Sequence, residues 1–304
     1  MAPLFDAYIV VDWSAAARPV SGANSIWICV LERDAGANLS SALFNPTTRL
    51  EARHLIFDTA NDLIARGRRV LIGFDFAMGY PSGTAKALGL DIKTAPPWRV
   101  MHDYLAAHIV EAEDNSNDRF PLAASMNDMM TGTAHPFWGA PASKTAPTLA
   151  ARKGDFSAPE SVPEHRLAEH WIKSEFQASP KSVWQLLGAG AVGSQSLLGI
   201  ATVAYLREHL PGALLWPFET GFGELTAKRL KNTSCILAEI YPSSLPISPD
   251  TGEILDRAQV RMLSNRFESL DSAGILGGAF DLPDSISGGE IHKIIDEEGW
   301  ILAK

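Results

Sequence analysis

Apolar residues cluster in blocks along the first quarter of the chain, and two of these blocks end at an aspartate. Residues 8–11 and 69–74 form nearly continuous apolar runs, which is typical of strands buried on both faces. Asp12 and Asp75 follow the two runs directly. Two more strands and a helix are expected between them, over residues 25–31, 43–54 and 58–66. The pattern therefore predicts an antiparallel meander, a helix and a second buried strand.

The pattern is weaker over residues 79–163, which we expect to be irregular apart from a helix over 98–113. Regular elements then follow over residues 164–176, 193–209, 213–216, 235–241 and 255–276. The strand over 235–241 carries Glu239 and is stopped by Pro242. The last helix places Asp271 at the edge of its apolar stripe. This order predicts an α/β fold in which helices flank a mixed sheet.

Four carboxylates fall on these expected core elements: Asp12, Asp75, Glu239 and Asp271. A buried carboxylate without a partner is costly, so a group of them needs a cation, a shared proton or dense hydrogen bonding. Oxygen ligands suit Mg²⁺ or Mn²⁺, and a pair of such ions can support phosphodiester hydrolysis. The alternative is that each acid is solvated or caps a helix.

Short motifs around the same acids resemble a large bacterial family of predicted nucleases, domain of unknown function 429, with a ribonuclease H-like fold. The resemblance rests on Val-Val-Asp-Trp-Ser at 10–14, Ile-Gly-Phe-Asp-Phe-Ala-Met-Gly-Tyr-Pro at 72–81, Ala-Glu-Ile-Tyr-Pro at 238–242 and Glu-Gly-Trp-Ile-Leu at 298–302. It implies one domain over residues 1–304, with a long helical or irregular insertion over about 80–232. It also implies that Asp12, Asp75, Glu239 and Asp271 are the catalytic and metal-binding acids.

A glycine motif offers a competing interpretation. Gly188, Gly190 and Gly193 have the Gly-x-Gly-x-x-Gly spacing of a dinucleotide-binding turn and precede an expected helix and strand. The segment before them is a poor strand, so a tight turn packed against a helix is the alternative. Such a turn can also bind phosphate through its backbone N–H groups. Candidate substrate-binding residues are Ser14, Arg166, Gly190, Ser194 and Gln195, and further candidate anion contacts are Arg119 and Lys144.

Composition limits the classes of partner that the chain is expected to bind. The chain has 304 residues and a formal charge of −9, so its average field repels polyanions, and any contact with nucleic acid must be local. Neither a secretory signal nor a membrane-spanning run is evident, which predicts a cytoplasmic protein without a membrane partner. No protein partner can be identified.

Three functions remain open from the sequence. The first is a Mg²⁺- or Mn²⁺-dependent hydrolase acting on nucleic acid or a small nucleotide. The second is an ATP-dependent phosphotransferase of the actin or sugar-kinase type, which normally needs two copies of the core. The third is a binding module for a nucleotide or a partner protein, without catalysis.

Overall fold

One seven-stranded mixed sheet organises the computed structural model, which describes residues 2–34, 36–157, 162–242 and 245–302. Its strands are β1 (Ala7–Asp12), β2 (Trp27–Arg33), β3 (Leu39–Phe44), β4 (Val70–Phe74), β5 (Ala213–Leu215), β6 (Cys235–Ile240) and β7 (Ile301–Leu302). The order is β3-β2-β1-β4-β6-β5, and β7 also pairs with β6. The first three strands are antiparallel neighbours, whereas β4, β6, β5 and β7 add in parallel. The α/β prediction with a mixed sheet is therefore confirmed.

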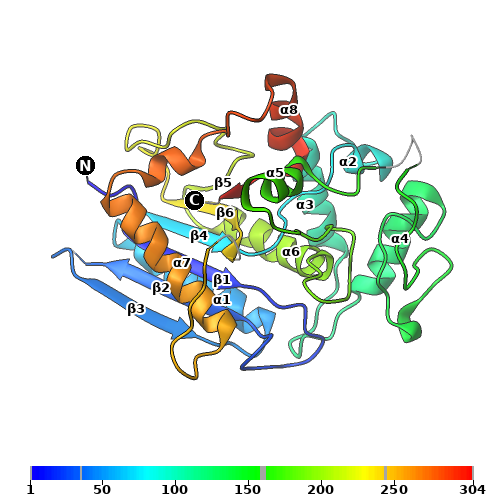
Figure 1. The fold of residues 1–304 in the computed structure, drawn as a ribbon, viewed down its shortest axis with the longest axis horizontal. Helices are drawn as coiled ribbons and strands as arrows, with labels where there is room; N and C mark the ends of the chain where they lie inside the picture. The colour runs from blue at the N-terminus through cyan, green and yellow to red at the C-terminus, as the bar shows by residue number, and fades with distance from the viewer. Residues whose placement is uncertain (1, 35, 158–161, 243–244, 303–304) are drawn as a thin grey trace.

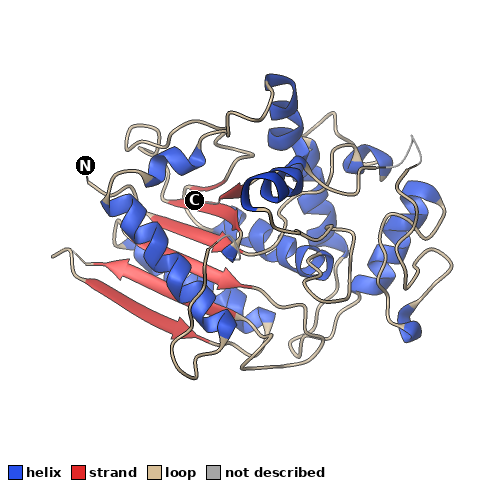
Figure 2. Cartoon of the chain, in the orientation of Figure 1, coloured by secondary structure: helices blue, strands red, loops and turns tan. Residues whose placement is uncertain are grey.

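Helices cover both faces of this sheet. They are α1 (Arg49–Ala65), α2 (Thr84–Ala87), α3 (Pro97–His108), α4 (Arg119–Thr131), α5 (Leu167–Phe176), α6 (Gly193–His209), α7 (Leu255–Ser272) and α8 (Gly288–Lys293), with short 3-10 or π turns at Ala142–Lys144, Leu276–Phe280 and Ile294–Glu298. In Figure 1, α7 crosses in front of β1 and β2. Most helices that follow β4 gather to one side of the strands (Figure 2).

Strand periodicity explains the two layers of core. Along β1, Ile9 and Val11 pack with residues of α1 and α6, whereas Tyr8 and Val10 pack with residues of α7. Successive side chains of a strand point to opposite faces, so a strand covered on both sides must be apolar throughout. The continuous apolar run that identified β1 in the sequence has this cause.

Several expected elements differ from the structure. The strand expected over 43–54 ends at Phe44, and α1 begins at Arg49 because Thr48 and Glu51 form a capping box. The region expected to be irregular contains α4, whose apolar residues show almost no helical periodicity. The last helix stops at Ser272 rather than 276, since Gly274 follows with a positive φ.

The stretch 80–232, expected to be an insertion, carries α2 to α6 and also β5. Part of it belongs to the core of the domain, because β5 pairs with β6 and α6 packs against one face of β1 and β4. None of the helices in the described residues is long and apolar enough to cross a membrane.

Candidate functional site

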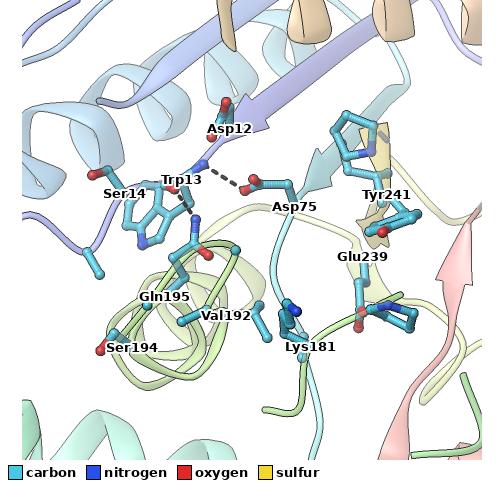
Figure 3. A pocket seen from close by; sticks show the side chains of 18 of the residues that line it. Asp12, Trp13, Ser14, Asp75, Lys181, Val192, Ser194, Gln195, Glu239 and Tyr241 are labelled. Atoms are coloured by element: carbon cyan, nitrogen blue, oxygen red, sulfur yellow. Dashed lines mark hydrogen bonds between the residues drawn. The ribbon is translucent and has the colours of Figure 1, made fainter. Parts of the chain in front are cut away.

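A pocket of about 630 Å³ opens where β1, β4 and β6 end and where α6 and α7 begin. Figure 3 shows Asp12 and Asp75 on one side of it, Glu239 on another, and the start of α6 facing them. Ligand sites in open α/β sheets lie beyond the carboxyl ends of parallel strands, so this is the expected position for one. The volume is also within the usual range for a small-molecule site.

Asp12 and Asp75 lie side by side because of the strand register. Val11 of β1 pairs with Phe74 of β4 in parallel, so the next residue of each strand is an aspartate on the same face. The backbone N–H of Trp13 donates to Asp75 Oδ1 at 2.7 Å, and the two carboxyl groups hydrogen-bond to each other. The sequence prediction that these two acids meet is consistent with this register.

The environment of this pair favours its protonated form. Burial raises the pKa of Asp12 well above its usual range, and the charges of Asp75 and Asp256 add to the shift. Burial also raises the pKa of Asp75 to about 7, although the hydrogen bonds from Trp13 and Asp12 oppose it. Two carboxyl groups in contact cannot both ionise easily, so they share a proton unless a cation replaces it.

Asp256 is the acid that the sequence interpretation missed. It lies in the first turn of α7, lines the same pocket, and accepts a hydrogen bond from the backbone N–H of Asn24 at 2.6 Å. An acid in the first turn of a helix is common for electrostatic reasons, so its position alone gave no functional signal. Its field on Asp12 and Asp75 makes it the third carboxylate of the site.

Glu239 lines the pocket but belongs to a different cluster. Its β6 position pairs with Phe74, which points to the face opposite Asp75. Arg166 Nη1 and Nη2 donate to its two carboxylate oxygens at 2.8 and 2.6 Å, and the backbone N–H of Met78 donates at 3.0 Å. Glu239 is therefore paired with a buried arginine that it shares with Glu169, and burial still raises its pKa. The expectation that it joins Asp12 and Asp75 in one shell is not met.

Arg166 was expected to bind substrate, and its contacts argue against that role. The side chain is 1% exposed and pairs with both Glu169 and Glu239. Its Nη1 also donates to the carbonyl of Glu298 at 2.9 Å, while Nε donates to Glu169. A guanidinium has five N–H donors, and these bonds occupy all five. No donor is left for a ligand.

Asp271 lies at the other end of β1. Its carboxylate accepts hydrogen bonds from the backbone N–H groups of Leu4 and Phe5, both at 2.8 Å, and from the Tyr8 hydroxyl at 2.7 Å. Tyr8 and Asp12 are four strand residues apart, which is about 13 Å. The predicted convergence of four acids is corrected accordingly: Asp271 anchors the N-terminal segment, since α7 runs along β1 and only its N-terminal end reaches the pocket.

The glycine motif forms a turn, not a dinucleotide-binding unit. Gly188 and Gly190 have positive φ angles, and a Cβ on Gly193 would lie 2.4 Å from the carbonyl oxygen of Val183. Residues 182–187 form no strand, so the required β-turn-α order is missing. Glu219 follows β5, where a dinucleotide-binding unit would have its ribose-binding acid, and it is instead paired with Arg207. The Rossmann interpretation is wrong for this reason.

The other predicted substrate-binding residues line the pocket, and their side chains differ in the hydrogen bonds that hold them. Ser14, Gly190, Ser194 and Gln195 all line it. Ser194 is buried, and its hydroxyl donates to the Leu186 carbonyl at 2.6 Å. The amide of Gln195 donates to the carbonyl of Trp13, which ties the start of α6 to the end of β1. Ser14 Oγ donates to the Asn24 carbonyl at 3.3 Å, at the pocket edge.

Two more basic residues line the pocket. Arg119 and the exposed Lys181 line the pocket, whereas Lys144, a predicted anion contact, is exposed and lies outside it. Lys181 carried no sequence signal, because it is an isolated lysine in a loop. Across the described ranges, no set of three or more His, Cys, Asp or Glu side chains is close enough to hold a metal ion by itself.

Together, the fold and this pocket define an α/β protein with an acidic pair at the carboxyl ends of adjacent parallel strands. Comparisons with family models, with curated protein sequences and with solved structures found no match.

Proposed function

We propose that the protein is a metal-dependent hydrolase that cleaves a phosphodiester bond in nucleic acid or in a small nucleotide. The observation that carries this proposal is the Asp12–Asp75 pair with Asp256 nearby. In the part of the chain that the structure describes, none of the three forms an ion pair with Lys, Arg or His. Three carboxyl groups that lie in one pocket without a basic partner favour a cation.

The sheet topology supports the ribonuclease H-like part of this proposal. Three antiparallel strands, β3, β2 and β1, are followed by β4 and β6 in parallel, and α7 packs across β1 and β2. This is the arrangement that the resemblance to the predicted-nuclease family implies. Fold likeness does not define chemistry, so the acidic pair remains the stronger support.

The donor set fits Mg²⁺ or Mn²⁺ better than a softer metal, because it consists of carboxylate oxygens alone. Mg²⁺ commonly binds through one or two carboxylates together with water and substrate phosphate, without a complete protein cage. Asp12 and Asp75 would hold the ion, and Asp256 would add negative potential. When bound, such an ion acidifies water and stabilises charge on a phosphoryl group.

The chain itself supplies positioning and electrostatics. Asp12 and Asp75 must lose their shared proton before they act as ligands, which links the site to pH values near and above 7. Trp13 N–H fixes the orientation of Asp75, and Gln195 fixes the loop after β1. Gly190 lines the same pocket as the acids, and the pocket has room for a phosphate-bearing substrate.

The kinase-like alternative has less support. That class needs two copies of the core for a closing cleft, whereas the residues described here form a single sheet. A binding module without turnover remains an outcome of the experiment below.

The test is hydrolysis of bis-p-nitrophenyl phosphate, short oligonucleotides and dinucleotides with Mn²⁺ or with EDTA. We expect Mn²⁺-dependent cleavage of at least one substrate, and a loss of 100-fold or more in Asp12→Asn and Asp75→Asn. Asp58→Asn, a change on the exposed face of α1, is the matched control and should keep full activity. Cleavage that survives in both site variants, or nucleotide binding without turnover, would exclude the proposal.

A further inference from the structure

Arg119 is a buried cation at the wall of the pocket. It is the first residue of α4, it is 8% exposed, and it lines the same pocket as Asp12 and Asp75. Its Nη1 donates to Asn117 Oδ1 at 2.9 Å, and its guanidinium lies 4.6 Å from the ring centroid of Phe120. Its Nε is buried with no hydrogen-bond partner. Among the described residues, it forms no ion pair with a carboxylate.

Two other buried arginines show how unusual this is. Arg166 uses all five donors on carboxylates and one carbonyl. Arg49 pairs with Glu111 and donates to the carbonyls of Ser14, Ala16 and Asn115. Of the three, Arg119 alone forms no ion pair, and the acid whose charge acts on it, Glu111, is already paired with Arg49.

The surroundings of Arg119 increase the cost of its charge. Burial, and then the positive charge of Arg49, lower the pKa of Arg119 to about 10. Arg119 also occupies the N-terminal position of α4, where the helix dipole disfavours a cation. A protein that keeps an unpaired charge under these conditions commonly uses it to bind an opposite charge.

The pocket therefore carries acidic groups and a basic group on different elements. The carboxyl groups of Asp12, Asp75 and Asp256 lie at the strand ends and the start of α7, and Arg119 belongs to α4. A ligand whose reacting bond lies at the acids and which extends to Arg119 would carry a second negative group there. Arginine is well suited to a phosphate, because its planar donors can form two parallel hydrogen bonds.

We propose that Arg119 binds a phosphate group of the substrate other than the one that is hydrolysed. This inference rests on the proposed function. It narrows the substrate class to small nucleotides that carry a second phosphate, such as short phosphorylated oligonucleotides or dinucleotides. A pocket of about 630 Å³ has room for such a molecule and not for a duplex.

The test measures binding without catalysis. AMP, inorganic phosphate and adenosine are titrated by calorimetry in EDTA into the wild type, Arg119→Met, Arg119→Lys and Arg152→Met. Arg152 is exposed, and it is the matched control for loss of one positive charge. We expect AMP and phosphate to bind the wild type and Arg152→Met, to bind Arg119→Met at least 10-fold more weakly, and to bind Arg119→Lys with intermediate affinity. Adenosine should bind at least 10-fold more weakly than AMP.

A second readout separates binding from folding. In the absence of ligand, Arg119→Met should have a melting temperature equal to or above that of the wild type, because the change removes an unpaired buried charge. Equal affinity of AMP for the wild type and Arg119→Met, or no AMP binding at millimolar concentration, would overturn the inference. So would a melting temperature of Arg119→Met that is more than 5 °C lower, which would assign Arg119 a structural role.

The two proposals can fail separately. If AMP binds through Arg119 and no substrate is hydrolysed with Mn²⁺, the phosphate site stands and the hydrolase is excluded. If hydrolysis depends on Asp12 while Arg119→Met binds AMP normally, the hydrolase stands and this inference is wrong.

Discussion

Two acidic clusters share one pocket, and they differ in what balances their charge. Glu169 and Glu239 surround Arg166, whose donors are fully used. Asp12 and Asp75 have each other, a shared proton and the nearby charge of Asp256. The first cluster contains a buried cation of the protein, whereas in the described residues the second forms no ion pair and holds a shared proton instead. Under the proposed function, the absence of a basic partner is what separates the metal-binding acids from the structural ones in this pocket.

The largest expected effect comes from removing Arg166, the cation of the first cluster. Arg166→Met leaves Glu169 and Glu239 buried without their cation, and it should cost about 3–5 kcal/mol of unfolding free energy. Chemical denaturation at pH 7 measures this loss, with Arg152→Met as the control. A loss below about 1 kcal/mol would mean that the cluster is not held by Arg166.

Removing an acid from the Asp12–Asp75 cluster should instead increase the free energy of unfolding. Asp75→Asn removes one of two facing carboxyl groups, and its amide can donate to Asp12. At pH 8 in EDTA, we expect the variant to be more stable by about 1–2 kcal/mol, because burial raises the pKa of Asp75 to about 7 and its ionised form therefore costs stability in the folded protein.

The pH dependence fixes the sign of this effect. Because the pKa of Asp75 is raised to about 7, the folded protein holds a proton that the unfolded chain loses near pH 4. The stability that this group contributes to the wild type should fall as the pH rises from about 4 to 7. Asp75→Asn should lose the part of this slope that is due to Asp75, and the part due to the raised pKa of Asp12 should remain. Denaturant titrations at pH 5 and 8 measure it. An Asp75→Asn variant less stable than the wild type at pH 8 would contradict the description of the pair.

The sequence predicted the part of the site that depends on strand ends. Asp12 and Asp75 follow apolar runs, and such runs place their final residues at one sheet edge. It could not predict the face on which Glu239 points, because that depends on the pairing of β6 with β4. A shift of one residue in that register would reverse the face.

The sequence also could not predict which end of α7 lies at the pocket. Periodicity identified α7 and its apolar stripe, but the direction in which α7 crosses β1 decides whether Asp256 or Asp271 reaches the acidic pair. The helix covers about 27 Å, so the two ends lie beside different ends of the sheet. Arg119 was one of three candidate anion contacts, and only the structure distinguishes it from Arg166 by its missing partners.

The most direct test of the central claim is calorimetric titration of Mn²⁺ into the wild type at pH 7.5, alongside Asp12→Asn, Asp75→Asn and Glu239→Gln. We expect the wild type to bind one or two ions and both aspartate variants to lose at least 10-fold in affinity. Glu239→Gln, which changes the cluster around Arg166, should bind Mn²⁺ as the wild type does, provided that circular dichroism shows it folded. Absence of binding to the wild type at millimolar Mn²⁺, or unchanged binding in Asp12→Asn and Asp75→Asn, would contradict the account.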